Sequence, residues 1–177
     1  MNILWFCCFF RQLRRTPKSK HGVDSEPPIE YPRVKENLDP KNYILEDKDV
    51  GVFGRAPGEI GGQQFAIRNC KDICIYLFDH INSIMIDDCI NCVIVTGPVK
   101  ASIFVRDCKN CRLLTACQQF RTRDCENITT FLACVTEPII ESSSNMFFGA
   151  YQCFYPELED CFAQTTEKSR RKVVFFR

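Results

Sequence analysis

Hydrophobic and polar residues alternate along the middle of the chain in segments that each end in a cysteine. The four segments read FAIRNC (65–70), IMIDDC (84–89), IFVRDC (103–108) and FRTRDC (120–125), so their cysteines are spaced by 19, 19 and 17 residues. Alternation with period two is typical of a β-strand, and a repeat of about 20 residues indicates stacked structural units. The pattern therefore predicts a β-solenoid between about Phe65 and Pro138.

The alternation assigns each position of the repeat to the interior or to the surface. Two mostly apolar columns, five and three positions before the cysteine, should face inward: Phe65, Ile84, Ile103 and Phe120, and Ile67, Ile86, Val105 and Thr122. Two other columns should face outward: Arg68, Asp87, Arg106 and Arg123, and Ala66, Met85, Phe104 and Arg121. An apolar outward stripe that ends in an arginine is a candidate partner site, and the alternative is an ordinary solvated strand face.

Each coil is completed by a corner and a second strand. The residue before the cysteine is of a type that suits a tight turn, namely Asn69, Asp88, Asp107 or Asp124. A second apolar segment follows each time, at 73–78, 92–97, 111–116 and 128–133. Two short strands and a corner per coil predict an all-β parallel β-helix of about four to six coils.

Four parts of the chain differ in composition. Residues 1–22 are apolar and then basic, and residues 23–50 are rich in proline and polar residues, which predicts a flexible arm followed by a linker and cap. The solenoid domain is placed at 51–158, with 139–158 as its last coil. Residues 159–177 do not follow the repeat and form a divergent tail.

The composition narrows the class of protein. The formal net charge is +1 over 177 residues, so no nucleic-acid partner is expected. The chain has 13 cysteines, but its apolar start lacks the basic residues and cleavage site of a secretory signal and is too short to span a bilayer. We expect a reducing compartment in which the thiols are mostly free.

Two C-x2-C pairs are separated by fifteen residues, which is a spacing found in zinc sites. Their four thiolates could surround a zinc ion tetrahedrally. The residues are Cys89, Cys92, Cys108 and Cys111. The repeat favours another interpretation, because the column of the second cysteine of each pair is occupied by Ile73 and Ile128 in the flanking coils. A position that exchanges with isoleucine behaves as a buried hydrophobe. We therefore expect stacked thiols and no metal site.

No catalytic constellation stands out in the chain. The two histidines are His21 and His80, and His80 lies in an expected corner, which favours a structural role. The glycine-rich spacings that hold a phosphate are missing from the sequence. We therefore expect no nucleotide or other cofactor bound by this chain alone.

Several motifs resemble one known family. The runs GGQQFAIRNC (61–70), GPVK (97–100), ACQQFRTRDC (116–125) and TEPIIESSSN (136–145) are similar to the tubulin-folding cofactor C domain, over about residues 39–158. The resemblance implies a right-handed parallel β-helix, in agreement with the repeat. It also implies a GTPase activator, without a reaction of its own, that acts on an Arf-like small GTPase of ciliary lipoprotein traffic and, in related members, on tubulin.

The resemblance assigns roles to individual residues. Arg121 matches the family's arginine finger, which neutralises charge on the phosphates of GTP that the partner GTPase holds with Mg²⁺. Gln119 is expected to hold Arg121 or the partner's water-positioning residue. The positions expected near the nucleotide are Ala101, Ser102, Gln118, Gln119, Phe120 and Arg121, and those expected to contact the GTPase are Phe104 and Glu141.

The two ends of the chain depart from the family pattern. The ciliary member begins Met-Gly-Cys, whereas Asn2 follows Met1 here, so N-myristoylation is not expected. Palmitoylation of Cys8 or Cys7 beside a basic segment would supply two membrane signals and predicts the cytoplasmic face of the plasma membrane, the ciliary base or the cilium. A different first exon without an anchor is the alternative.

The match to the family stops near Leu158, which suggests a C-terminally truncated form. A second function then has to be considered: a GTPase- or tubulin-binding module that no longer accelerates hydrolysis.

Overall fold

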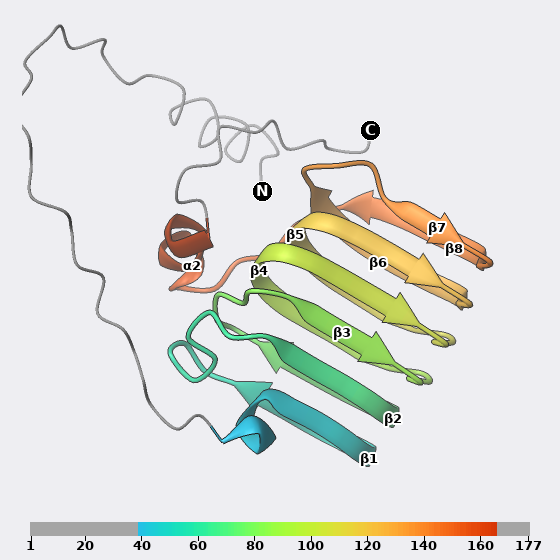
Figure 1. The fold of residues 1–177 in the computed structure, drawn as a ribbon, viewed down its shortest axis with the longest axis horizontal. Helices are drawn as coiled ribbons and strands as arrows, with labels where there is room; N and C mark the ends of the chain where they lie inside the picture. The colour runs from blue at the N-terminus through green and yellow to red at the C-terminus, as the bar shows by residue number, and fades with distance from the viewer. Residues whose placement is uncertain (1–38, 166–177) are drawn as a thin grey trace, which may run out of the picture. The chain divides into compact units, whose positions relative to one another are not determined.

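The computed structural model describes residues 39–165, which form a parallel β-solenoid of about six turns. Its elements are η1 (Pro40–Tyr43), β1 (Ile44–Arg55), β2 (Phe65–Leu77), β3 (Ile84–Asp87), β4 (Val93–Arg106), β5 (Arg112–Arg123), β6 (Glu126–Cys134), β7 (Ile139–Glu141), β8 (Ser144–Ala150) and α2 (Leu158–Thr165). The strands pair in the order β1-β2-β3-β4-β5-β6-β8, and β7 pairs with β5. Figure 1 shows them stacked as successive coils. The predicted solenoid is therefore confirmed.

The register of the strands keeps equivalent positions of the repeat in columns. Ile67 pairs with Ile86, which pairs with Val105 in the next coil. Both predicted inward columns are confirmed, because their side chains are no more than 2% exposed. Apolar side chains from all coils meet in one continuous core, and burial of this apolar surface is the main driving force for folding.

The cysteine columns belong to this core. The Cys108 thiol donates to the carbonyl oxygens of Arg106 at 3.0 Å and Ile86 at 3.8 Å. Hydrogen bonding with Cys111 and other neighbouring thiols, together with burial, raises the pKa of Cys108 far above its ordinary value, which keeps the thiol protonated. Within residues 39–165, no three His, Cys, Asp or Glu side chains are grouped so that they could hold a metal ion.

Two residues with positive φ bend each coil between its strands. The first precedes the cysteine position and the second follows three residues later, with φ between 47° and 56°. The first column is Asp47, Asn69, Asp88, Asp107, Asp124 and Ser142, and the second is Val50, Asp72, Asn91, Asn110, Asn127 and Asn145. Asn and Asp tolerate this left-handed conformation better than most residues. The first column confirms the predicted corner, and the second completes it.

Side chains of the second corner column form a ladder along the solenoid. Asn110 donates through Nδ2 to Asn91 Oδ1 at 3.2 Å and accepts from Asn127 Nδ2 at 2.8 Å. Asn91 in turn donates to Asp72 Oδ1 at 2.8 Å. The ladder links successive bends and so helps to keep the coils in register.

The solenoid begins earlier than the boundary expected at Gly51. Strand β1 pairs in parallel with β2 from Ile44 to Arg55. Lys48 occupies the cysteine position of this coil, opposite Cys70. The first coil therefore lacks the cysteine that marks the next four coils, because this exposed position at the end of the solenoid does not require a small buried residue.

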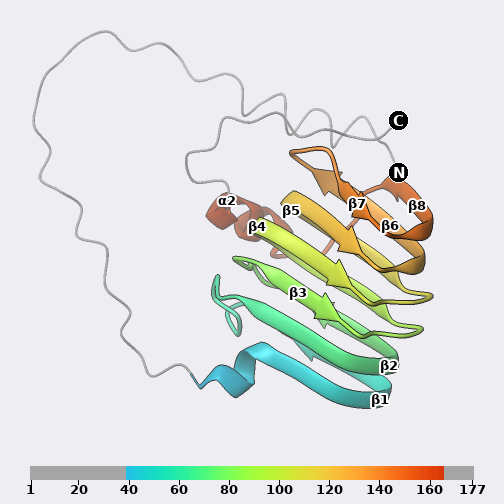
Figure 2. The ribbon, with the colours of Figure 1, turned by 45° about the vertical axis from the view of Figure 1, so that its right-hand side comes forward.

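After β8 the chain returns along the side of the solenoid to α2, which contacts β4 (Figure 2). Tyr155 and Leu158 are buried there against Phe78, with the Phe78 and Tyr155 ring centroids 4.9 Å apart. A Cβ atom on Gly97 would clash with the backbone carbonyl oxygen of Asp79 and would also come within 2.7 Å of the Tyr155 hydroxyl oxygen. Only glycine fits at this point, because the Asp79 backbone and the returning segment both lie against it.

Asp79 anchors the glycine-rich loop between β1 and β2. Its carboxylate is buried and accepts backbone N–H groups from Ile60 and Gly61, both at 2.8 Å, and from His80 at 2.8 Å. Burial alone would raise the pKa of Asp79, but these donors outweigh it and lower the pKa. The His80 Nδ1 atom lies 3.0 Å from the same carboxylate, which gives His80 a structural position.

Substitution of Asn110 should separate the contribution of the ladder hydrogen bonds from that of the positive-φ backbone. Asn110→Ala removes the ladder bonds and places an alanine at positive φ, so the free energy of unfolding should fall by about 1–3 kcal/mol. Asn110→Gly loses the ladder bonds but accepts the backbone conformation, so its loss should be smaller. Urea denaturation measures both, and equal losses would contradict the importance of the positive φ.

Asp79 should make stability depend on pH. Because its pKa is lowered in the folded state, its contribution is complete above about pH 4, the ordinary pKa of Asp, and is lost as pH falls through the lowered value. Asp79→Asn should reduce the free energy of unfolding at pH 7 by about 1–3 kcal/mol. The difference from the unsubstituted protein should shrink below pH 4 in urea denaturation, and a constant difference down to pH 2 would refute this linkage.

Candidate functional site

Two outward columns lie side by side on the first strand of each coil, and together they are called the arginine face here. One column contains Ala66, Met85, Phe104, Arg121 and Ile139. The other contains Glu46, Arg68, Asp87, Arg106, Arg123 and Glu141. The predicted outward stripe is confirmed except at Ala66, which is only 9% exposed.

The charged column alternates in sign until it reaches Arg106. Asp87 lies between Arg68 and Arg106, and it accepts Arg106 Nε at 2.8 Å and Nη2 at 2.7 Å. Asp87 points outward as predicted but is only 6% exposed, so the expectation that it faces water is wrong. Its carboxylate is held between flanking arginines, and its hydrogen bonds raise the pKa of Arg106.

The next position in this column is a second arginine, Arg123, with no acid between it and Arg106. The ring of Phe104 lies beside this like-charge pair. The guanidinium carbons of Arg106, Arg121 and Arg123 lie 5.3, 5.2 and 5.9 Å from the ring centroid. Cation–π attraction stabilises such an arrangement, so Phe104 gathers three arginines on one surface.

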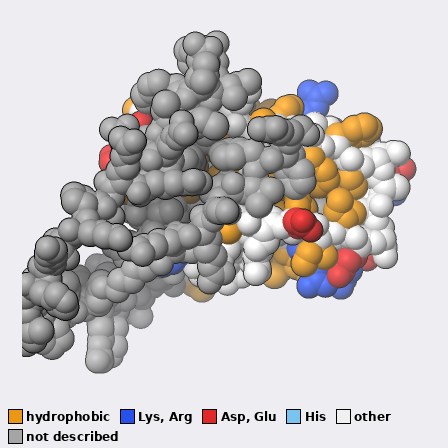
Figure 3. Space-filling view, turned by 90° about the horizontal axis from the view of Figure 1, so that it is seen from above, with side chains coloured by type: hydrophobic (Ala, Val, Ile, Leu, Met, Phe, Trp, Pro, Cys, Tyr) orange, Lys and Arg blue, Asp and Glu red, His pale blue; other side chains and the backbone are white. Residues whose placement is uncertain are grey.

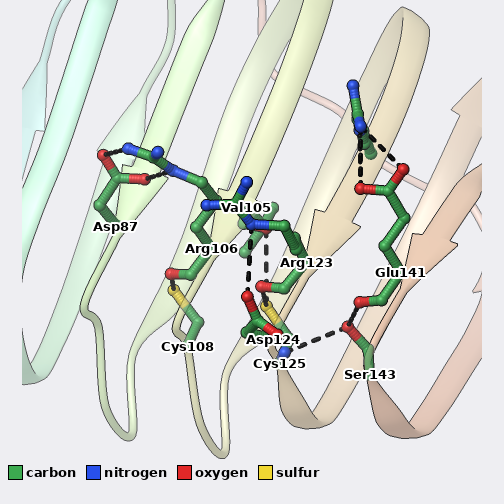
Figure 4. Close-up of polar contacts among 10 residues, drawn as sticks. Asp87, Val105, Arg106, Cys108, Arg123, Asp124, Cys125, Glu141 and Ser143 are labelled. Carbon is green, nitrogen blue, oxygen red and sulfur yellow. Dashed lines mark hydrogen bonds and ion pairs between the residues drawn. The ribbon is translucent and has the colours of Figure 1, made fainter.

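Arg121 is held by Glu141, which comes from the next coil. The Nη2 atom lies 2.7 and 2.8 Å from the two carboxylate oxygens, and Nε donates to Oε2 at 3.3 Å. Figure 4 shows the Glu141 carboxylate directed at the guanidinium that it binds. The side chains of Arg121 and Glu141 are 48% and 38% exposed, so the ion pair remains open to a partner.

The position of Glu141 is set by the corner that follows it. Ser143 donates from its hydroxyl to the Glu141 carbonyl oxygen at 2.8 Å and accepts the Cys125 backbone N–H at 3.1 Å (Figure 4). These bonds tie the polar cluster after β7 to the preceding coil. Glu141, expected to contact the GTPase, is therefore also the residue that orients Arg121.

The coil that carries Arg121 has 17 residues, two fewer than the preceding coils. The extra residues of the preceding coil are accommodated by irregular pairing in β4. Its register with β5 shifts once between Val95 and Pro98 and again between Val99 and Ser102. Ala101 and Ser102, expected near a nucleotide, lie half-buried at the second shift. Irregularities of this kind re-aim side chains at the edges of functional sites.

The remaining predicted residues differ in how they face the surface. Gln119 is exposed on the same face of β5 as Arg121 and pairs in register with Ser102. Phe120 is 1% exposed and its side chain lies in the core, so it supports the strand from inside. Gln118 is half-buried, and its carbonyl oxygen accepts the backbone N–H and the hydroxyl of Thr136, both at 3.2 Å.

The arginine face can bind an oxyanion through the planar forks of its guanidinium groups. Arginine stays protonated and presents paired N–H donors that match phosphate and carboxylate oxygens. Two of the three arginines around Phe104 are paired with carboxylates of other coils, and the third, Arg123, lies 3.3 Å from its exposed neighbour Asp124. Each of the three arginines is thus held beside a carboxylate, and an incoming anion would compete with these acids.

A model of the tubulin binding cofactor C family matches residues 62–174. The chain belongs to this family. The match includes the returning segment and every residue of the arginine face from Ala66 to Glu141, which confirms the resemblance described from the motifs. It continues to residue 174, so the expectation that the match stops near Leu158 is wrong.

Curated relatives support the assignment. The chain is 48% identical to human Protein XRP2 over 153 residues, which are 85% of this chain and 44% of the relative. It is 51% identical to Protein XRP2 of Danio rerio over 149 residues, 82% of this chain and 40% of the relative. Human Tubulin-specific chaperone C is 27% identical over 111 residues, 63% of this chain and 32% of the relative. The chain thus spans less than half the length of these relatives.

A solved structure shares the fold. The Cyclase-Associated Protein from Cryptosporidium parvum matches with a TM-score of 0.55 and 14% identity, over 88% of this chain and 86% of that chain. Tubulin Binding Cofactor C from Leishmania major is 30% identical, over 56% of this chain and 51% of that chain, with a TM-score of 0.39.

Proposed function

We propose that this chain activates GTP hydrolysis by an Arf-like small GTPase and that Arg121 is its arginine finger. The carrying observation is that the guanidinium of Arg121 faces outward on a solenoid strand and is oriented by Glu141 and Phe104. Membership of the tubulin binding cofactor C family and similarity to Protein XRP2 support a role as a GTPase activator or tubulin cofactor.

The ion pair leaves Arg121 able to donate to a phosphate. Among the described residues, Glu141 is the only hydrogen-bond partner of its side chain and uses Nε and Nη2. The N–H groups of Nη1 are thereby free to meet oxygens that gain charge between the β- and γ-phosphates. A positioned arginine reduces the reorganisation needed when the partner docks.

GTP and Mg²⁺ belong to the partner in this proposal. Gln119 lies on the same face of β5 as Arg121 and pairs with Ser102, which follows Ala101. These three residues would approach the nucleotide, while Phe104 and Glu141 would contact the GTPase. Tubulin is a second possible GTP-binding partner, because a relative in the family is named Tubulin-specific chaperone C.

We also propose that the N-terminal segment attaches the protein to a membrane. Cys7, Cys8 and the basic residues that follow lie outside the described residues, and their acylation remains a prediction from sequence. The described part of the chain contains no helix long and apolar enough to cross a bilayer. An acyl chain beside basic residues would instead place the site at the cytoplasmic face of a plasma or ciliary membrane.

A second candidate function is binding without activation. It is favoured by the same ion pair, because the guanidinium of Arg121 would have to give up bonds to Glu141 in order to move to a phosphate. The two functions differ in one measurable respect. An activator accelerates hydrolysis, whereas a binding module associates with the GTP-loaded partner and leaves its hydrolysis rate unchanged.

Removal of Arg121 tests the proposal. Arg121→Ala should lower the stimulated single-turnover rate of GTP hydrolysis by about 10³-fold or more, because an arginine finger contributes about 10³ to 10⁵ in rate. Binding to the GTPase loaded with a non-hydrolysable GTP analogue should change little. If the Arg121→Ala variant still stimulated GTP hydrolysis, the assignment of Arg121 as the arginine finger would be wrong.

The matched control is Arg112→Ala. Arg112 is an exposed arginine at the start of the same strand, β5, but outside the arginine face. Its removal changes the net charge by the same amount and should leave stimulated hydrolysis unchanged. If the unsubstituted chain binds the loaded GTPase without stimulating it, the binding-module function replaces the activator.

Acylation of the N-terminus can be tested separately. The chain expressed in cultured cells should incorporate a palmitate analogue through a hydroxylamine-sensitive bond, since a thioester is cleaved by hydroxylamine. Changing Cys7 and Cys8 together to serine should abolish the label and shift the protein from the membrane to the soluble fraction. Labelling that persists in the double variant would show that the lipid is attached elsewhere.

A further inference from the structure

The second strand of each coil presents a different outward surface. Tyr76, Val95, Leu114 and Phe131 pair in register along four successive strands, and they are called the apolar stripe here. Three of them are half-buried and Phe131 is 43% exposed. An outward column of large apolar side chains indicates a surface that binds another part of the chain or a partner.

The chain already covers the column beside the apolar stripe. Pro98, Ala116 and Ala133 pair in register there, and Ala116 and Ala133 are only 4% and 5% exposed although alternation directs them outward. The returning segment 151–165 lies on this side of the solenoid, with α2 in contact with β4 (Figures 1 and 2). The apolar stripe therefore begins where this cover ends.

A pocket lies between the apolar stripe and the start of the returning segment. Its volume is about 390 Å³, and it is lined by Leu114, Phe131, Ala150 and Gln152. The lining is mostly apolar, and the space is large enough for an aromatic side chain. An apolar side chain would therefore fit this pocket better than a charged one.

The next part of the chain has the composition that this surface requires. Residues 166–177, which lie outside the described residues, read TEKSRRKVVFFR. Their apolar run Val173–Phe176 follows a basic run, while exposed acids, Glu157, Glu159 and Asp160, lie at the start of α2. The family match also continues to residue 174, so most of this segment is aligned with the domain.

The geometry allows the segment to reach the apolar stripe. Four neighbouring strands at about 4.8 Å spacing give the stripe a length of roughly 14 Å. The ten residues from Thr166 to Phe175 can extend about 33 Å from the end of α2. We propose that residues 166–177 dock on the apolar stripe of the same molecule, with an aromatic side chain of Val173–Phe176 in the pocket.

The open end of the solenoid is the competing position. Hydrophobic side chains gather at this end, which Figure 3 views from above, and Phe147 and Ile139 there are 58% and 52% exposed. A strand added at this end would pair with the free edge of β8. The apolar stripe is favoured because it has a pocket and lies next to a segment that the same chain already contributes.

Photo-cross-linking in the full chain tests the proposal. With p-benzoylphenylalanine in place of Phe175, irradiation should join the segment to peptides that contain Leu114 or Phe131 in the same molecule, as mass spectrometry would show. Leu114→Asp with Phe131→Asp should reduce this product to background. Phe104→Asp, an outward substitution on the arginine face, should leave it unchanged.

Several outcomes would overturn the proposal: cross-links confined to β8, a covalent dimer as the main product, or a product insensitive to the substitutions on the stripe. Hydrogen exchange gives a second readout that leaves the solenoid sequence intact. Val173→Asp with Phe175→Asp should accelerate exchange in the peptides around Leu114 and Phe131 and leave those around Phe104 unaffected. Unchanged exchange around Leu114 would contradict docking on the stripe.

Discussion

Every coil of the solenoid bends at two backbone positions with positive φ, and the rest of the structure depends on this bend. A left-handed residue costs about 1–2 kcal/mol with an ordinary side chain, so the corner favours Asp and Asn. Their side chains bond to the same residue types in neighbouring coils, as Asn110 does with Asn91 and Asn127. Because the bend recurs at one place in each coil, strands stack in register and side chains fall into columns.

The columns explain how one surface can hold several like charges. Arg106 and Arg123 are neighbours in one column, an arrangement that repulsion disfavours. Asp87 compensates on one side and Glu141 on the other, and the Phe104 ring lies against the guanidinium groups between them. The acids and the ring therefore offset the repulsion between the two arginines.

The irregular coil lies directly beside the arginine face. The repeat shortens from 19 to 17 residues between Cys108 and Cys125, and β4 accommodates the change through two register shifts. The second shift precedes Ser102, which faces Gln119 across the strands. Arg121 therefore lies on a regular strand, and the irregularity is confined to the neighbouring strand β4.

The repeat, the inward columns, the first corner column and the outward direction of Arg121 could be predicted from the amino-acid sequence, because period-two alternation and the cysteine spacing are local patterns. The sequence also indicated the family through continuous motifs. The first coil does not show the same pattern, because Lys48 stands where a cysteine marks the next four coils.

Which side chains meet depends on the three-dimensional arrangement of the coils. Glu141 lies in the column of Arg123 yet binds Arg121 diagonally, and Asp87 becomes buried because arginines from two coils enclose it. Ala116 and Ala133 are buried although their positions point outward, on a solenoid along which the chain returns to place α2 against β4. These contacts depend on side-chain reach between coils and on the path of the returning chain, and neither is encoded in the spacing of the repeat.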